Sequence, residues 1–260
     1  MPDYGSMSWR GQRRTVLSAP YFFPAMSALK LSIALSLILV ATAAAQTTVD
    51  DVVARNLAAK GGVEKLRAIT TVKMSGSLKS PSGVTAITTW AKRPSFMRRE
   101  NVNDGQTFVM AFDGKTLWQI NPLISPRPRD VPAPPGDAED FDSLLLDYKE
   151  KGRTVELVAT EPVQGINMHR LRVTEKNGQI RDIYINAETM LESKTVVQVE
   201  QGARKAIVTT EFSNYKTIDG ISVPMHVRQI LNGKPLTEVT YERIEFNVAI
   251  PDSMFAKPVQ

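Results

Sequence analysis

The sequence predicts a mainly β protein, built as an antiparallel meander with a few covering helices. From Thr70 onward, short segments in which apolar and polar residues alternate follow one another, as half-buried strands do. Residue pairs that favour tight turns separate several of them, namely Asn177-Gly178, Asp219-Gly220 and Asn232-Gly233. Parallel strands would need crossover connections of a dozen residues or more, and this spacing leaves no room for them. We therefore expect hairpin after hairpin rather than βαβ units.

The N-terminal region contains a segment typical of a secretory signal. Residues 26–46 hold Lys30 as a charged start, an apolar run over residues 31–40, and the small residues Ala43-Ala44-Ala45. The rival interpretation is a transmembrane anchor, but the apolar run is shorter than the roughly 20 residues that span a bilayer. We favour cleavage after Ala45 and export to the periplasm.

Removing residues 1–45 also changes the charge of the protein. The 260-residue chain carries a net charge of +5, but this segment holds four basic residues and one acidic residue, which leaves +2. We expect residues 1–45 to be an N-terminal extension plus a cleaved signal peptide, and residues 46–260 to be a single domain. The near-neutral domain does not indicate nucleic-acid binding. Translation starts at either Met1 or Met26, and Met26 fits the signal better.

Two regions have the spacing of amphipathic helices. Residues 48–60 place four apolar residues on one face before Gly61-Gly62 ends the pattern: Val49, Val52, Val53 and Leu57. A short second turn follows, up to Ile69. Residues 140–151 repeat the helical spacing, with Asp140 as a plausible cap and with Phe141, Leu144, Leu145 and Tyr148 on one face.

The strands fall into two groups on either side of a proline-rich stretch. Residues 122–136 hold six of the chain's 16 prolines, so this stretch cannot pair in a central strand and is expected to extend over the surface. Before it we expect strands at residues 71–78, 84–91, 95–103, 108–112 and 117–120. After it we expect strands at residues 154–160, 168–175, 179–186, 190–200, 206–215, 221–231 and 236–246.

The strand over residues 108–112 and its return strand form an apolar sheet face. Phe108, Met110 and Phe112 alternate with smaller residues, and Asp113-Gly114 supplies the positive φ angles of a tight turn. Trp118 lies on the return strand. Such a face is either a packed core or the wall of a cavity, and the residues alone suit both.

The same stretch resembles a known family. Lys92-Arg93-Pro94, then Asp113-Gly114-Lys115-Thr116-Leu117-Trp118 and Asn121-Pro122, resemble the periplasmic outer-membrane lipoprotein carriers, the LolA-like lipoprotein-sorting family. The resemblance implies an incomplete antiparallel β-barrel, a half-barrel with a helical lid, whose apolar cavity holds the acyl chains of lipoproteins or a similar amphiphile. It also implies an inner-membrane donor complex and an outer-membrane receptor as partners.

The resemblance further implies which residues form the site. Arg93 matches the arginine that helps to control the lid in that family, and the residues of the second predicted helix become the lid: Phe141, Leu144 and Leu145. The ligand-binding residues are expected to be Arg93, Phe96, Phe108, Met110, Phe112 and Trp118. No cofactor or metal is expected.

Catalysis is not indicated by the sequence. His169 and His226 stand in separate strand patterns without the spacing of a zinc site, and neither a nucleophile elbow nor a phosphate-binding loop occurs. Cysteine is absent, which excludes disulfides, thiol catalysis and a lipid-bearing cysteine. The alternative to a carrier is a non-catalytic envelope module, structural or interacting, with the same barrel and a filled core.

Overall fold

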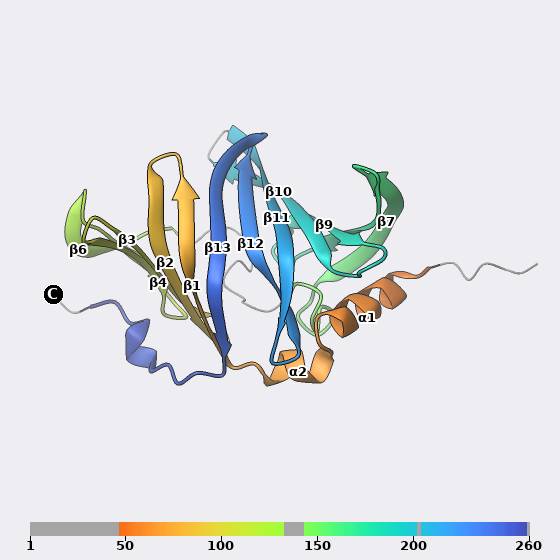
Figure 1. Ribbon diagram of the computed structural model, residues 1–260, viewed down its shortest axis with the longest axis horizontal. Coiled ribbons are helices and arrows are strands. Elements are labelled where there is room, and N and C mark those ends of the chain that lie inside the picture. The colour runs from red at the N-terminus through yellow and green to blue at the C-terminus, as the bar shows by residue number, and fades with distance from the viewer. Residues whose placement is uncertain (1–46, 133–142, 202–203, 259–260) are drawn as a thin grey trace, which may run out of the picture. The chain divides into compact units, whose positions relative to one another are not determined.

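The computed structural model describes residues 47–132, 143–201 and 204–258 (Figure 1). In this part of the chain, the helices α1 (Val49–Ala59) and α2 (Val63–Ala68) precede the strands, and a short 3-10 helix, η1 (Asp252–Met254), follows them. The strands are β1 (Thr71–Ser80), β2 (Gly83–Lys92), β3 (Phe96–Asn103), β4 (Gln106–Phe112), β5 (Leu117–Asn121), β6 (Ser125–Asp130), β7 (Thr154–Val163), β8 (Ile166–Thr174), β9 (Ile180–Asn186), β10 (Glu192–Gln201), β11 (Arg204–Ile218), β12 (Ile221–Leu231) and β13 (Lys234–Phe246). The expected signal segment and Phe141 lie outside the described residues.

The thirteen strands of this described part form one antiparallel sheet. Their order is β6-β5-β4-β3-β2-β1-β13-β12-β11-β10-β9-β8-β7. Neighbours in the sheet are neighbours in the chain except at the centre, where β1 pairs with β13. Since β6 and β7 lie at opposite edges, the sheet does not close. The predicted meander and open half-barrel are confirmed. The proline-rich β6 is an edge strand, where a residue without an N–H is tolerated.

The turn chemistry explains the hairpin order. Both residues of the pairs Asp104-Gly105, Asp219-Gly220 and Asn232-Gly233 have positive φ angles, between 47° and 78°. Two consecutive residues in this region make the two-residue turn whose twist matches that of the flanking strands. Asn, Asp and Gly reach positive φ at the lowest cost, so these local pairs direct each strand back beside the previous one.

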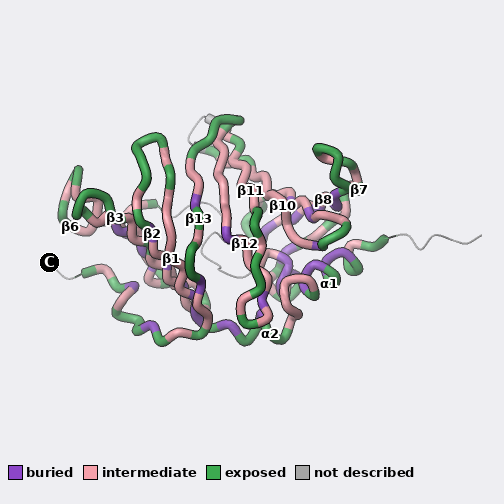
Figure 2. Tube along the Cα trace, in the orientation of Figure 1, coloured by how far each residue is buried: buried purple, intermediate pink, exposed green. Residues whose placement is uncertain are grey.

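The sheet has two faces, which the cross-strand register identifies. Side chains of directly opposite residues point to the same face. Val72 lies opposite both Ala91 and Phe246, and Phe246 packs against the cluster that contains the helices. We call this the helix-side face and the opposite one the outer face. Figure 2 shows buried segments where the helices meet the sheet and exposed segments at the hairpin tips.

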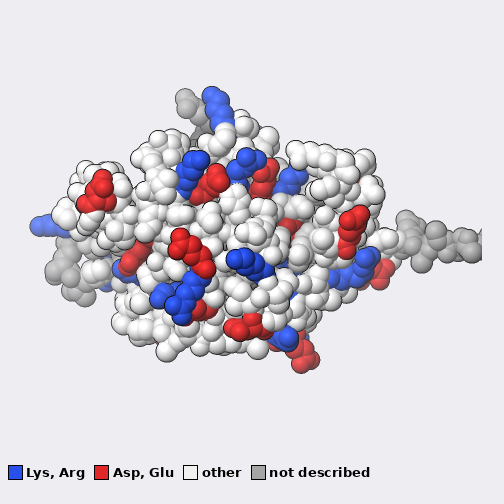
Figure 3. All heavy atoms as spheres, viewed as in Figure 1, with Lys and Arg blue, Asp and Glu red and all other residues white. Residues whose placement is uncertain are grey.

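The outer face of the second half of the sheet carries paired charges. Asp182 accepts hydrogen bonds from Arg170 and Arg172, and Glu211 accepts from Arg228. Figure 3 shows acidic and basic side chains beside one another over the visible surface. Most of these pairs are partly exposed, so they add solubility and register more than stability.

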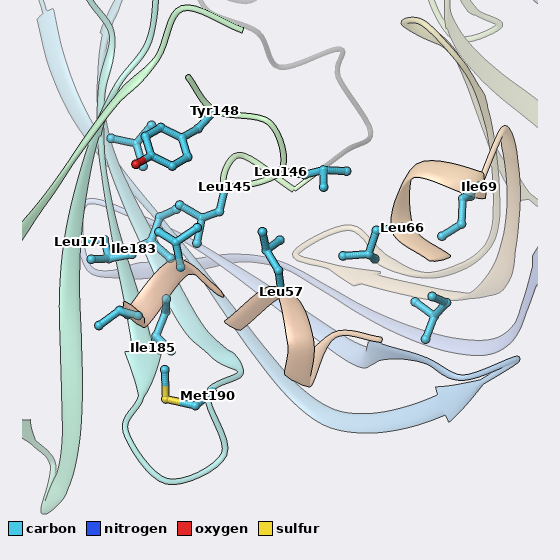
Figure 4. Close-up of a cluster of buried hydrophobic side chains, with 14 residues drawn as sticks. Leu57, Leu66, Ile69, Leu145, Leu146, Tyr148, Leu171, Ile183, Ile185 and Met190 are labelled. Carbon is cyan, nitrogen blue, oxygen red and sulfur yellow. The ribbon is translucent and has the colours of Figure 1, made fainter. Parts of the chain in front are cut away.

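The helix-side face of the second half is a packed core (Figure 4). Its cluster joins both helices to β8, β9 and β12 and contains Val52, Val53, Leu57, Leu66, Ile69, Leu145, Leu146, Tyr148, Leu171, Val173, Ile183, Ile185, Met190 and Ile221. Val155 from β7 and Phe246 from β13 pack against the same cluster. The cluster therefore extends beneath the helices from β7 to β13.

Helix α1 confirms the first predicted helix. Thr48 caps it, since its side chain accepts a hydrogen bond from the Asp51 N–H while the Asp51 carboxylate accepts from the Thr48 N–H. Asn56 is buried, and its side-chain amide donates to the Met190 carbonyl at 2.7 Å. This bond ties the helix to the turn between β9 and β10.

The second predicted helix, over residues 140–151, is wrong where the structure describes it. Residues 144–152 form a series of turns. Asp147 has a φ of +55°, a left-handed conformation that an α-helix cannot continue through. The apolar spacing reflects burial nonetheless, because Leu145 and Leu146 are almost fully buried in the core cluster.

Candidate functional site

The helix-side face of β1–β5 is the candidate site. The core cluster around the helices contains no residue from β2 to β6 within the described chain. Nearest the helices, the register places an apolar row across the sheet, Phe112–Met97–Ala91–Val72. Phe112 and Ala91 are buried, whereas Met97 is half-buried. This end of the face is thus apolar and mostly buried, with Met97 partly exposed.

Three of the expected wall residues lie on this face. Phe112 is opposite Met97, Met110 is opposite Arg99, and Phe108 is opposite Asn101. Phe108 and Met110 are half-buried. The alternation seen in the sequence therefore brings these three side chains to one surface.

Phe96 and Trp118 lie on the outer face instead. The four-residue turn after Phe112 pairs Phe112 with Leu117, so Trp118 falls opposite Ala111 and points away from Phe112. Phe96 lies opposite Lys92, one residue out of step with Met97. The five apolar residues expected on one wall are thus divided between two faces.

The C-terminal segment covers Trp118 on the outer face. The Trp118 indole N–H donates to the Phe255 carbonyl at 2.9 Å, and Trp118 and Phe255 are both fully buried. The rings of Phe96 and Phe255 stand 5.4 Å apart. An Arg98 N–H donates to the Met254 carbonyl at 3.0 Å. The C-terminal segment thus forms a packed apolar contact around Phe255.

Arg93 joins the end of β2 to the end of α2. Its Nε donates to the Ile69 carbonyl at 2.6 Å and its Nη2 to the Leu66 carbonyl at 3.1 Å. The last carbonyls of a helix lack partners within the helix, and a cation there also interacts favourably with the helix dipole. The peptide bond between Arg93 and Pro94 is cis. Arg93 thus has the contacts that a latch would need, and its control of a lid stays a prediction.

The segment expected to form the lid lies next to this latch. The single Nε–H of Arg67 is shared between both carboxylate oxygens of Asp147, and the Arg67 Nη2 donates to Oδ1. This bonding is the first cause of the lowered pKa of Asp147. Tyr148 donates to Asp50 of α1 at 2.8 Å. Leu145 is fully buried and Leu144 packs beside the same cluster. Residues 143–152 are therefore held by both helices, and the lid role of Leu144 and Leu145 stays a prediction.

Several polar groups that the sequence does not predict lie on the same face. Among the described residues, Oγ1 of Thr85, Oγ1 of Thr89 and Oδ1 of Asn101 are buried without a hydrogen-bond partner. Burial raises the pKa of Tyr241, and the nearby charge of Arg99 opposes this rise. No periodic signal marks such residues, because their shared face depends on the register of four strands.

A second polar group lies on the outer face. His226 places Nδ1 3.0 Å from the Ser213 hydroxyl and Nε2 2.8 Å from a Glu238 carboxylate oxygen. The lowered pKa of Glu238 has this hydrogen bond as its first cause. Ser213 and His226 are a directly opposite pair in the β11–β12 ladder, on a face open to solvent. We interpret the group as a cross-strand hydrogen-bond network rather than a catalytic triad.

The described residues offer two further observations. Within residues 47–132, 143–201 and 204–258, no three His, Asp or Glu side chains come together in a way that could hold a metal ion. In the same ranges, neither helix is long and apolar enough to cross a membrane.

Comparison with known proteins identifies the fold. No family model matches the sequence, and no curated protein matches it either. Among solved structures, a LolA superfamily protein from Nitrosomonas europaea is similar with a TM-score of 0.56 at 14% identity, over 81% of this chain and 98% of that one. The fold is LolA-like. A DUF1329 family protein from Desulfovibrio piger matches this LolA-like fold with a TM-score of 0.55 at 15% identity, over 80% of this chain and 97% of that one.

Proposed function

We propose that the chain is a periplasmic carrier that binds the acyl chains of lipoproteins, or a similar amphiphile, on the helix-side face of β1–β5. The observation that carries this proposal is that side chains on this face differ in burial from one part of the sheet to the other. Beneath α1 the central side chains Leu171, Ile183 and Ile185 are at most 1% exposed, whereas Met97, Phe108 and Met110 remain half-buried. Each methylene group transferred from water to such a surface contributes about 0.8 kcal/mol.

The LolA-like fold supports the proposal at the level of architecture. The signal pattern of residues 26–46 supports export, and the family resemblance implies a donor complex in the inner membrane and a receptor in the outer membrane. Arg93 is proposed to hold α2 against the end of β2 until cargo enters. Two hydrogen bonds can be broken at a cost that acyl-chain burial offsets, so loading would need no nucleotide.

A filled-core envelope module is the second candidate. The packed cluster between α1, α2 and β7–β9 favours it, because the same type of filling could extend along the whole face. In that case the protein would act through its surface, and Phe108 and Met110 would be ordinary core residues.

A lipid-binding assay separates the two candidates. A fluorescent acyl probe is titrated with the purified chain, and a triacylated lipopeptide is added as competitor. We expect binding in the micromolar range or tighter, and Met110→Asn to weaken it at least tenfold, since a covered Met side chain contributes about 1.5–3 kcal/mol.

Val102→Asn is the matched control. Val102 lies on the outer face of the neighbouring strand and is 42% exposed, so its replacement leaves the helix-side face intact. A folded protein that leaves the probe free would contradict the carrier. Equal weakening by both variants would show that the probe binds elsewhere.

A further inference from the structure

The charges on the helix-side face of β1–β6 are all of one sign. A single row across four strands runs Arg99–Met110–Gln119–Arg129, since each residue lies opposite the next. Thr89 extends this row on the other side of Arg99. The register places no Asp or Glu of these six strands on this face, whereas Glu100 and Asp130 point to the outer face. The surface is therefore apolar and cationic.

The two arginines differ from most others in the described chain. Arg98, Arg170, Arg172, Arg181, Arg228 and Arg243 each contact a carboxylate. Within the described residues, neither Arg99 nor Arg129 takes part in an ion pair, and both are exposed. Two guanidinium groups that face the same apolar surface without an acid have unused capacity for an anion.

Buried oxygens beside Arg99 add a second, independent observation. Thr89 is 4% exposed, and its hydroxyl has no hydrogen-bond partner within the described chain. Oγ1 of Thr85 and Oδ1 of Asn101 are in the same situation on adjoining positions of the same face. A buried hydroxyl or amide without a partner is unfavourable, so three of them on one surface indicate a group that supplies the missing bonds.

These polar groups occupy one part of the face and the apolar row occupies another. The row that contains Phe112 and Met97 lies at the end of the strands near α2, and the row that contains Arg99 and Thr89 lies further along them. We propose that this face binds an amphiphile with an anionic head group, held by Arg99 and Arg129, whose acyl chain lies toward Phe112. The inference rests on the carrier function and specifies its ligand class.

Paired probes that differ only in the head group test this proposal with the full chain. Phosphatidylglycerol and phosphatidylcholine that carry the same fluorescent acyl chain form one arm. A fluorescent fatty acid and the corresponding fatty alcohol form the other, which separates a phosphate from a carboxylate. We expect the anionic member of at least one pair to bind at least tenfold tighter, and this preference to shrink at high salt.

Arg99→Gln and Arg129→Gln remove the charge but keep a hydrogen-bonding side chain. Each should weaken the anionic probe roughly tenfold and leave its neutral or zwitterionic counterpart unchanged. Arg243→Gln is the matched control, because Arg243 lies on the outer face, where its exposed side chain pairs with Glu245. Circular dichroism of each variant verifies that it is folded.

The outcomes are distinguishable. If the anionic and the uncharged or zwitterionic probe bind equally in both pairs, the head-group proposal is wrong but the carrier function stands. The same holds if Arg243→Gln and Arg99→Gln weaken binding of the anionic probe equally. Failure of every probe to bind a folded protein would overturn both.

Discussion

Arg93→Met tests the contact between the end of β2 and α2. The substitution removes the side-chain hydrogen bonds to the Leu66 and Ile69 carbonyls, at 3.1 and 2.6 Å, but keeps an apolar stem of similar length. A bond from a charged donor contributes about 1.5–3 kcal/mol. Because the site is half-exposed and water can replace part of the bonding, we take about 2 kcal/mol for the two bonds together.

This free energy should appear as local opening of α2. A loss of about 2 kcal/mol raises the population of the open state roughly thirtyfold. Hydrogen exchange measured by mass spectrometry should therefore show the amides of residues 63–69 exchanging roughly thirtyfold faster. Strands such as β11 should exchange as in the unaltered protein. If the open state accepts cargo, the acyl probe binds as well or better and its transfer to acceptor vesicles slows.

The choice of control follows from the structure. Arg98 contacts Glu100 and the C-terminal segment, so its replacement would not be neutral. Arg243→Met removes an equally long side chain from the outer face and should leave exchange in α2 unchanged. If hydrogen exchange in α2 is unaltered in Arg93→Met, or is accelerated equally in both variants, Arg93 does not hold α2 closed.

Two further predictions concern stability. Phe255→Ala should lower the free energy of unfolding by about 3–4 kcal/mol, as expected for a fully buried Phe, and thermal unfolding of the folded variant measures this; a loss below about 1 kcal/mol would mean that the C-terminal segment is not a structural seal. Burial lowers the pKa of His169 below its ordinary value of 6.5, so the unfolded chain binds more protons than the folded one, and stability falls as the pH drops below about 6.5. Denaturant unfolding measures the free energy of unfolding between pH 7.5 and 5. This free energy should decrease less in His169→Gln, where Gln can keep the hydrogen bond to Thr160, than in the unaltered protein or in His226→Gln. Equal decreases in all three proteins would contradict the assignment to His169.

Much of the fold could be predicted from local sequence, because its causes are local. Pairs such as Asp219-Gly220 and Asn232-Gly233 determine hairpins through their own φ preferences, and a chain of hairpins makes a meander without long-range information. The α1 pattern ends at Gly61-Gly62 for the same reason. The helix expected over residues 140–151 fails where the structure describes it because periodicity reports burial, and turns around Asp147 bury the same leucines.

The site depends on relations that no local pattern contains. Alternation within one strand correctly joins Phe108, Met110 and Phe112, since side chains two residues apart share a face. It cannot relate Trp118 to them, because a turn of one residue more or less would reverse the face of the whole return strand. The C-terminal segment that covers Trp118 comes from 137 residues further along the chain.

The sequence by itself thus determined the secondary structure of most segments, the order of the hairpins and the apolar character of the region around Phe112. Only the tertiary structure decided which residues share a surface. Arg99 and Arg129 come to lie in one row through three strand pairings, and packing leaves the hydroxyl of Thr89 without a hydrogen-bond partner among the described residues. The physical reason is that turn preferences act between adjacent residues. Which side chains share a face, which are buried and which charges lie near one another depend instead on the pairing register of every strand in the sheet.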